Sequence, residues 1–270
     1  MTVEETIAAR VSRRSYLPAP LSPAEKARLE RRIGQFRSAG VRIELVEDGA
    51  AAFARFGKSY GLFSGVHTFA ALIGRADDPA SGEKLGYYGE LLVLEATGLG
   101  LGSCWVGGTY DPDACPCALA PGETLKCVIA LGSCAQKRGV KESLIYRFAR
   151  RGTKDLEQLY TADDPVPAWF LEGMQAVRRA PSAFNKQPVQ FCFARGGVTA
   201  SVPDLAQHRD LDLGIAKAHF ALPAGGRWGW GNGAAFDKQA RGQYGMEVSK
   251  AVDALLAAQE QVPVERCIYR

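Results

Sequence analysis

Arginine and serine residues alternate near the N-terminus, in the segment ARVSRRSY that follows the helical stretch VEETIAA. If this segment is extended, Arg10, Ser12 and Arg14 project to the same side of the chain. Two guanidinium groups supply charged N–H donors and the hydroxyl supplies one more, a combination that suits a phosphate group. The alternative is a basic segment in contact with water, the usual environment of clustered charges. The spacing alone leaves both interpretations open.

A glycine-rich segment, LGLGSCWVGGTYD at residues 99–111, follows the end of a predicted helix. Gly107 and Gly108 come after a short apolar run that ends at Val106, so bare backbone N–H groups there can approach a flat ligand closely. The segment ends a helix, whereas the dinucleotide-binding pattern GxGxxG opens one after a strand. A Rossmann-type nucleotide site is therefore excluded at this position.

Two cations, Lys137 and Arg138, follow a predicted buried strand in the segment LGSCAQKRGVKES. They could reach the same anion as the N-terminal arginines. They could equally face water, because basic residues after a strand commonly do so.

The loop APSAFNKQP, residues 180–188, lies between a predicted helix and a predicted strand. Proline disfavours helix in the residue before it, so the loop is irregular, and its small side chains leave the backbone open to close approach. Such a loop either carries a ligand on a rigid frame or only ends the helix. The residues that could meet a ligand are Pro181, Ser182, Ala183 and Asn185.

The elements that position these segments form two successive passes through one α+β pattern. Each pass has a basic amphipathic helix, a strand and then a longer helix rich in Gly and Leu, which suggests an internal duplication. A linker is predicted at residues 161–169, which contain two prolines and two aspartates. The predicted helices cover residues 24–40, 86–100, 168–179 and 211–224, and the predicted strands cover residues 41–48, 125–133 and 189–194.

The composition is that of an ordinary globular protein, with 270 residues, 47% hydrophobic content and 23% charged residues. The formal net charge is +4 and the basic residues are scattered, so no nucleic-acid surface is expected. No stretch approaches the roughly 18 to 20 apolar residues of a membrane helix, and we expect a cytoplasmic protein. Cys115 and Cys117 form a CxC pair, which is too weak a signal to predict a metal site or a disulfide.

Together these segments resemble the nitroreductase family of FMN-dependent oxidoreductases over most of the chain. The family segment RxSxR is similar to ARVSRRSY, and the family loop APSxxNxQP is similar to residues 180–188 at every specified position. The resemblance implies an FMN site. Its phosphate and ribityl chain would contact Arg10, Val11, Ser12, Arg14, Lys137 and Arg138, and its ring would lie near Val106, Gly107, Gly108, Pro181, Ser182, Ala183 and Asn185.

The order of the segments departs from the usual family pattern, in which the loop follows soon after RxSxR. Ordinary members are homodimers that combine segments of both subunits in each of two sites. Here residues 1–160 keep the RxSxR and Gly-Gly segments, and residues 161–270 keep the loop. The resemblance therefore implies a nitroreductase-like α+β fold of two tandem repeats, each a mostly antiparallel sheet flanked by helices. They would pack as a pseudo-dimer in a monomer with a single FMN.

The activity implied by the resemblance is hydride transfer from NAD(P)H through the flavin to a nitroaromatic, quinone or similar electron-poor acceptor. The mechanism would be ping-pong, with the chemistry on the flavin and no catalytic side chain or metal. Trp228 and Trp230 either shape the substrate entrance or fill space. Two alternatives stay open: an FMN-binding carrier or sensor without turnover, and a specialised member such as a dehalogenase or a flavin-modifying enzyme.

Overall fold

The computed structural model describes residues 1–55, 61–135, 142–144, 147 and 152–240, and the predicted site residues Lys137 and Arg138 lie outside these ranges. The elements of the first half are α1 (Val3–Ala9), α2 (Pro23–Phe36), η1 (Arg37–Ala39), β1 (Arg42–Val46), α3 (Ala50–Ala54), β2 (Thr68–Arg75), α5 (Ser81–Gly98), β3 (Gly102–Val106), η2 (Pro112–Ala114) and β4 (Glu123–Gly132). Those of the second half are η3 (Leu156–Gln158), β5 (Tyr160–Ala162), α7 (Ala168–Val177), η4 (Ala183–Asn185), β6 (Gln190–Ala194), β7 (Gly197–Ser201), α8 (Arg209–Ala224), β8 (Arg227–Trp228) and β9 (Ala235–Asp237).

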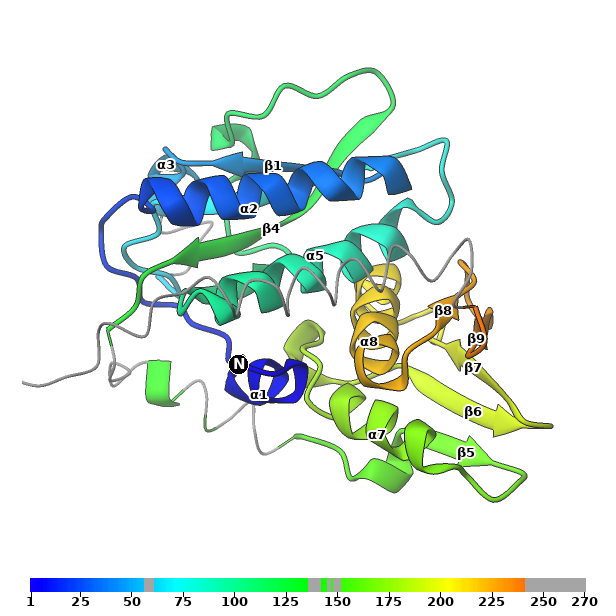
Figure 1. The fold of residues 1–270 in the computed structure, drawn as a ribbon. Coiled ribbons are helices and arrows are strands. Elements are labelled where there is room, and N and C mark those ends of the chain that lie inside the picture. Colours follow the sequence, from blue (N-terminus) through cyan, green and yellow to red (C-terminus); the bar gives the residue numbers. More distant parts are fainter. Residues whose placement is uncertain (56–60, 136–141, 145–146, 148–151, 241–270) are drawn as a thin grey trace, which may run out of the picture.

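Four antiparallel strands form the first sheet, in the order β1-β2-β4-β3. All of β2 except its last residue is buried, as is the C-terminal part of β4, which is the continuous apolar run typical of strands covered on both faces. Helix α2 packs against β1 and α5 (Figure 1). It begins at a capping box in which the Ser22 hydroxyl accepts the Glu25 N–H, and Pro23 occupies the first turn.

The second sheet has five strands in the order β5-β6-β7-β9-β8. Strands β6 and β7 form a hairpin whose two turn residues, Arg195 and Gly196, both have positive φ, as a type I′ turn requires. Strand β5 pairs in parallel with β6 at the edge of the sheet. The predicted linker at residues 161–169 therefore begins as an edge strand.

The two sheets repeat one connection pattern. In the first sheet β2 leads into α5 and the chain returns through β3 and β4; in the second sheet β7 leads into α8 and the chain returns through β8 and β9. The order β1-β2-β4-β3 therefore matches the order β6-β7-β9-β8, and every pairing within these two sets is antiparallel.

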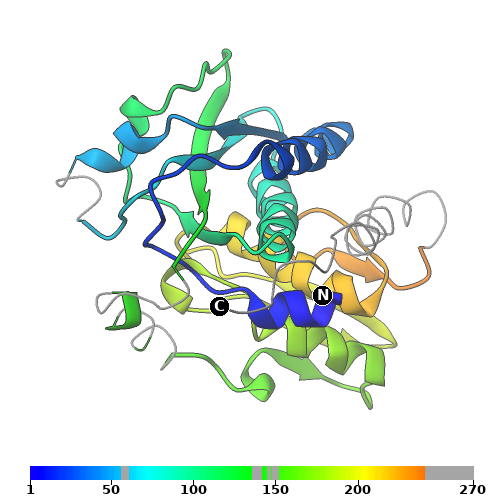
Figure 2. The same ribbon diagram turned by 60° about the vertical axis from the view of Figure 1, so that its left-hand side comes forward.

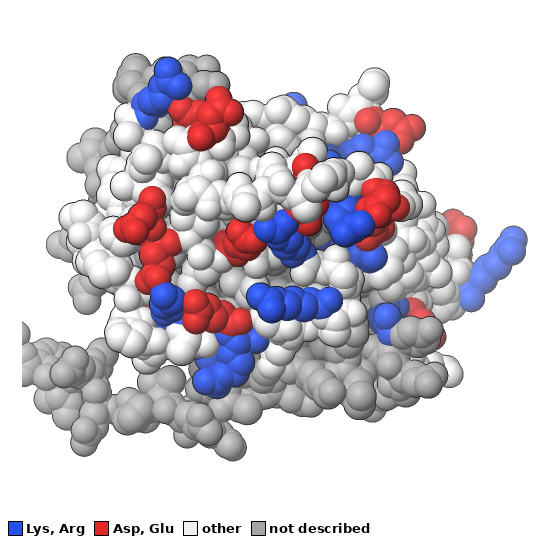
Figure 3. Space-filling model, turned by 90° about the horizontal axis from the view of Figure 1, so that it is seen from above, with Lys and Arg blue, Asp and Glu red and all other residues white. Residues whose placement is uncertain are grey.

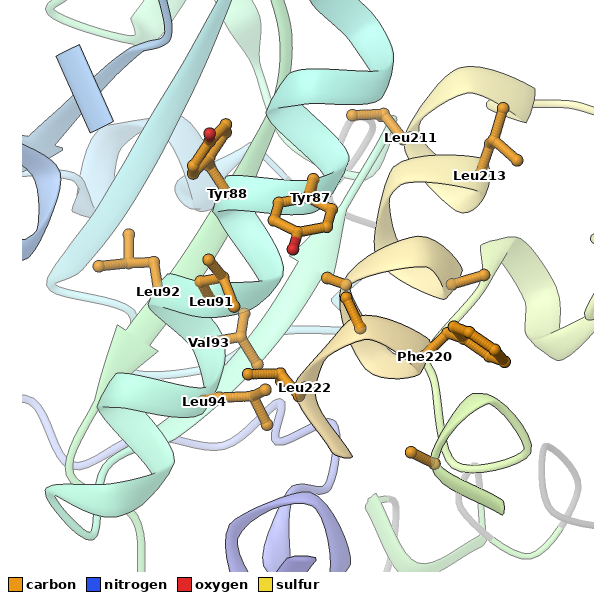
Figure 4. Packing of buried hydrophobic residues seen from close by; sticks show 14 of the residues in the cluster. Tyr87, Tyr88, Leu91, Leu92, Val93, Leu94, Leu211, Leu213, Phe220 and Leu222 are labelled. Carbon is orange, nitrogen blue, oxygen red and sulfur yellow. The ribbon is translucent and has the colours of Figure 1, made fainter. Parts of the chain in front are cut away.

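Helices α5 and α8 pack extensively against each other between the two sheets. Every residue of α5 from Leu85 to Ala96 is buried, because the first sheet covers one side of the helix and α8 covers another. Leu94 of α5 and Leu222 of α8 lie on the facing sides of the two helices, whereas Phe220 points away from α5 (Figure 4). The Phe220 ring stacks on Phe191 of the second sheet, so residues of both sheets join one hydrophobic core.

The N-terminal helix α1 lies below α5 and contacts both α5 and α8 (Figures 1 and 2). A capping box formed by Thr2 and Glu5 starts this helix. The chain then runs to α2 as an extended segment that bridges to Ser103 of β3 through Ser12 and to Ser64 through Ser15. Because β3 is an edge strand, the segment lies along the open edge of the first sheet.

Charges of both signs are interspersed on the face over α2 and β1 (Figure 3). Ion pairs account for part of this mixture, since Lys26 pairs with Glu47 and Arg42 pairs with Glu44. No helix within the described ranges is long and apolar enough to cross a membrane.

Candidate cofactor site

The N-terminal segment presents Arg10, Ser12 and Arg14 around one neighbour, the buried thiol of Cys104. Burial raises the pKa of this thiol, and Arg14, a hydrogen bond with the Ser12 hydroxyl and Arg10 all act in the opposite direction. Ser12 itself bridges to Ser103 of β3, so the segment is extended at this point. This extended backbone, in which alternate side chains project to the same side, runs along the edge of the first sheet.

Arg13 and Arg14 have opposite environments. The Arg13 Nε donates to Glu142 Oε1 at 3.1 Å, and its Nη2 donates to the Ala135 carbonyl at 2.9 Å. Glu142 is buried and also accepts the backbone N–H of Arg14 at 2.7 Å. The Arg14 guanidinium makes no hydrogen bond or ion pair with the part of the chain that the structure describes. Among the described residues, Arg13 is therefore engaged inside the protein, whereas the Arg14 guanidinium is not.

A buried polar network holds Arg10. Its Nε lies 3.8 Å from Glu90 Oε1 and makes no hydrogen bond, although the atom is buried. Its Nη2 donates to the Arg179 carbonyl at 3.4 Å. Glu90 Oε2 accepts the Trp105 indole N–H at 2.7 Å, and Glu90 Oε1 lies 2.9 Å from His219 Nε2. Arg10 thus connects the N-terminal segment to α5, α8 and the start of the loop at residues 180–188.

The backbone that follows β3 is open at one glycine and packed at the other. A Cβ on Gly108 would meet nothing within 4 Å, whereas a Cβ on Gly107 would lie 2.8 Å from the His208 ring. His208 is the N-cap of α8 and has a left-handed backbone. Val106 is buried in the smaller of the two core clusters, so only its backbone can meet a ligand. The Gly-Gly segment is therefore supported by α8 and leaves Gly108 accessible.

The loop at residues 180–188 has a strained backbone. Phe184, Asn185 and Gln187 have φ values of 54°, 53° and 45°, in the left-handed region that non-glycine residues seldom adopt. The Ser182 hydroxyl holds the conformation by accepting the Gln187 N–H at 2.9 Å. Backbone strain of this kind is often retained where a loop serves function rather than stability.

Asp212 ties this loop to the first turn of α8. Its two carboxylate oxygens lie 3.0 and 3.3 Å from the Ala183 N–H, which donates to them. Burial raises the pKa of Asp212 to about 7, and the hydrogen bond from Ala183 opposes that rise. The Ala183 N–H is therefore engaged inside the protein.

Contacts connect the predicted segments to α5, to the start of α8 and to one another, with Asn185 as an exception. Arg10 reaches the loop through Arg179, Gly107 reaches α8 through His208, and Ala183 reaches α8 through Asp212. Pro181 and Ser182 lie half-buried in the loop, and Val11 lies half-buried between Arg10 and Ser12. The Asn185 side chain instead turns to Thr153, to whose hydroxyl it donates at 3.3 Å.

Four residues of this site were missed in the sequence, namely Glu90, His208, Asp212 and His219. Glu90 carries a usable signal, since it is a charged residue within the apolar stretch GYYGELLVLEA. The histidines and Asp212 carry none, because their partners lie far away in the sequence.

The tryptophans of the segment GGRWGWGNG both pack against other aromatic rings. Trp228 is buried, packs against Phe236 and donates its indole N–H to the Lys217 carbonyl at 2.9 Å. Trp230 packs edge-on against Tyr87. The buried position of Trp228 supports a space-filling role for that ring, whereas Trp230 is half-buried and the two interpretations of it stay as predicted.

Comparison with known proteins places the chain in a family. A family model described as "Putative TM nitroreductase" matches residues 2–224. The chain belongs to this nitroreductase family. A search of curated proteins finds no match.

Solved structures described as nitroreductases are similar to this chain to different extents. A "putative nitroreductase" from Thermotoga maritima superposes with a TM-score of 0.59 at 17% identity, covering 87% of this chain and 92% of that one. A nitroreductase family protein from Clostridium difficile 630 gives a TM-score of 0.44 at 16% identity, covering 61% of this chain and 100% of the other. A nitroreductase with bound FMN from Bacteroides fragilis gives a TM-score of 0.39 at 18% identity, covering 52% and 92%. The first of these supports the α+β nitroreductase-like fold for most of the chain.

Proposed function

We propose that this nitroreductase-family chain is an FMN-dependent oxidoreductase that uses NAD(P)H to reduce a small electron-poor acceptor, such as a nitroaromatic or a quinone, in a ping-pong reaction. One observation carries the proposal. In the extended N-terminal segment, the buried Nε of Arg10 makes no hydrogen bond and the Arg14 guanidinium has no partner among the described residues, which supports a site for an anionic group there.

The phosphate end of the cofactor fits the N-terminal segment. The buried Nε of Arg10 has no hydrogen bond, and the Arg14 guanidinium has no partner among the described residues. Two such cations beside the Ser12 hydroxyl suit a dianionic phosphate and the polar chain attached to it. Lys137 and Arg138, outside the described residues, remain proposed partners of the same phosphate.

The ring end of the cofactor fits the backbone after β3 and the loop at residues 180–188. Gly108 has open space where a side chain would be, so its backbone can approach a flat ring. Pro181 and Ser182 would face the ring from the loop, whose strained backbone is held by Asp212 through Ala183. We retain Asn185 as a proposed contact through its backbone, because its side chain turns to Thr153.

Residues 1–160 and 161–270 are proposed as the two repeats of a pseudo-dimer. The shared strand order of the two sheets and the equivalent positions of α5 and α8 support this proposal. In that relation the segment after β8 corresponds to the Gly-Gly segment after β3.

The corresponding segment in the second half is closed by a buried ion pair. Lys217 Nζ pairs with Glu83 and donates to the carbonyls of Gly229 and Gly231 at 3.1 and 3.0 Å. The Gly231 N–H donates to Glu83 at 2.6 Å. The backbone groups that would meet a second flavin are already bonded, which supports one FMN per chain.

The residues of the chain would bind and orient the cofactor rather than react. FMN, when bound, supplies the hydride and electron transfer between NAD(P)H and the acceptor. Arg10 and Arg14 would neutralise the phosphate, and the Gly108 backbone would offer an N–H to the ring. The loop at residues 180–188 would cover the ring and exclude water from part of it.

The test is the absorbance spectrum of the purified full chain, with the released flavin identified and counted. We expect one FMN per chain, bleaching of the spectrum by NADH or NADPH under anaerobic conditions, and recovery of the colour on addition of a nitroaromatic or a quinone. The double variant R10A/R14A should lose bound FMN while keeping its fold.

Each other outcome has a distinct meaning. A chain that binds no flavin contradicts the proposed function. Bound FMN that neither nicotinamide nucleotide reduces would favour a carrier or sensor, and two FMN per chain would contradict the single-site pseudo-dimer.

A further inference from the structure

His219 lies at the centre of the α5–α8 contact and touches two hydrogen-bond acceptors. Its Nδ1 is 3.0 Å from the carbonyl oxygen of Ala176 on α7, and its Nε2 is 2.9 Å from Glu90 Oε1 on α5. The side chains of His219 and Glu90 are fully buried. The cofactor contacts proposed above do not include this histidine.

The two acceptors determine where protons must be. A carbonyl oxygen only accepts, so Nδ1 carries a hydrogen. If Nε2 carried none, its lone pair would face a carboxylate oxygen at 2.9 Å, and two acceptors would repel each other in a buried setting. One more proton therefore lies between Nε2 and Glu90, either on the ring as an imidazolium or on the carboxyl group.

This proton determines the charge beside Arg10. The Arg10 guanidinium is 3.8 Å from Glu90, close enough for an ionised Glu90 to neutralise it. With the shared proton, His219 and Glu90 together carry no net charge. The group of Arg10, Glu90 and His219 then has a net charge of +1, held by the side chain that is closest to the proposed phosphate.

We propose that His219 is a positioning residue that keeps the positive charge of Arg10 available to an anionic cofactor group, by supplying the proton that neutralises Glu90. This inference rests on the proposed FMN function. Glu90 orients Arg10 but would compensate its charge if it were alone, and the Trp105 indole N–H holds Glu90 in place from the other side.

The test is a double-mutant cycle on the full chain, with two probes: FMN, which has the phosphate, and riboflavin, which lacks it. In H219Q the glutamine cannot carry the charge, so Glu90 compensates Arg10, and FMN affinity should fall about tenfold or more, the effect of one charge-assisted contact. Riboflavin affinity should stay within about twofold, because that ligand does not use the Arg10 charge.

The direction in which FMN affinity changes when E90Q is added to H219Q distinguishes the two explanations. In E90Q/H219Q neither residue is charged, so Arg10 regains its net charge, and FMN should bind more tightly than in H219Q despite the additional change. A purely structural role for His219 predicts the opposite, with the double variant as weak as H219Q or weaker. If H219Q does not fold, H219N replaces it in both variants, since its amide occupies the position of Nδ1.

Glu95 provides the matched control. It lies on the same helix as Glu90, is also buried, and pairs with Arg28 and Arg32 of α2 instead of Arg10. E95Q should leave the ratio of FMN to riboflavin affinity unchanged. An unchanged ratio in H219Q would overturn the inference, whereas a wild-type chain that binds neither flavin would overturn the proposed function first.

Discussion

Gly86 of α5 and Gly214 of α8 bring the two helices into contact backbone to backbone. A Cβ on Gly86 would lie 2.2 Å from the Leu211 carbonyl oxygen, and a Cβ on Gly214 would lie 1.9 Å from the Glu83 carbonyl oxygen. The contact is reciprocal, because each glycine faces the residue three positions before the other glycine. A two-fold axis between the helices would produce this pattern, so the contact supports the proposed relation of the two halves.

Substituting Gly214 with alanine should destabilise the protein. The added methyl group would meet backbone that cannot rotate away, so α5 and α8 must separate, and we expect the free energy of unfolding to fall by about 2 kcal/mol or more. Urea denaturation followed by circular dichroism measures this change.

Gly98 gives the control for that substitution, since a Cβ there would meet nothing within 4 Å. G98A should raise the free energy of unfolding by about 0.5 to 1 kcal/mol, because alanine loses less backbone entropy on folding. Equal effects of G214A and G98A would contradict the close helix crossing.

The buried pair of Lys217 and Glu83 should respond differently to single and double substitution. K217M leaves the Glu83 carboxylate buried without its partner, and we expect a loss of about 3 to 5 kcal/mol in the free energy of unfolding. E83Q/K217M removes both charges and should recover part of that loss. A double variant less stable than K217M would show that the charges are not coupled as the contact indicates.

Asp212 should make the protein less stable as pH rises from 4 to 7. Its pKa is raised from 3.8 to about 7, so across this range the folded state holds a proton that the unfolded state has released. The stability associated with that proton is present at low pH and lost as pH approaches 7, by roughly 2 to 4 kcal/mol.

The variant D212N should remove this dependence, because its side chain has no proton to lose and can still accept the Ala183 N–H. Urea denaturation of the wild type and of D212N at pH 5 and pH 7.5 measures how much the free energy of unfolding of each protein changes with pH. D210N serves as the control, since Asp210 is exposed beside it on the same helix turn. A slope that persists in D212N would assign the effect to another group.

Neighbouring arginines should separate cofactor binding from stability. R14Q should weaken FMN binding by about tenfold or more, because it removes a charged donor that has no partner among the described residues, and it should change the free energy of unfolding by less than about 0.5 kcal/mol. R13Q should do the reverse, since it leaves the buried Glu142 without its partner at an expected loss of about 2 kcal/mol or more. Fluorescence titration with FMN and urea denaturation measure the two effects, and matching effects of the two variants would contradict the assignment.

Several elements could be predicted from periodicity and end signals alone. Helices α7 and α8 and strand β6 agree with the predictions within two residues at each end. Helix α5 begins at Ser81. The predicted helix begins only at residue 86, since SGEKLG has the composition of a loop. The glycines of this stretch allow α8 to pack closely against α5. A Cβ on Gly82 would lie 2.9 Å from Asp210, and Gly86 faces Leu211. Local propensity could not show this, since the reason lies in a distant helix.

The candidate site also has a part that could be predicted from the sequence and a part that could not. The grouping of Arg10, Ser12 and Arg14 could be predicted because strand geometry alone puts alternate residues on one side. The partnership of Glu90 with His219 could not, because it depends on how α5 crosses α8. Asn185 fits the sequence pattern, yet its side chain turns to Thr153 because the left-handed backbone of the loop directs it there.

Helices α5 and α8 belong to one polypeptide, so their association is a unimolecular equilibrium. When two separate subunits share a site, dilution below the dissociation constant takes the halves apart by mass action. A covalent connection instead keeps the local concentration of one half around the other constant. The proposed site formed by the N-terminal segment, the backbone after β3 and the loop at residues 180–188 would therefore stay assembled at any protein concentration, and its occupancy would depend on the free ligand alone.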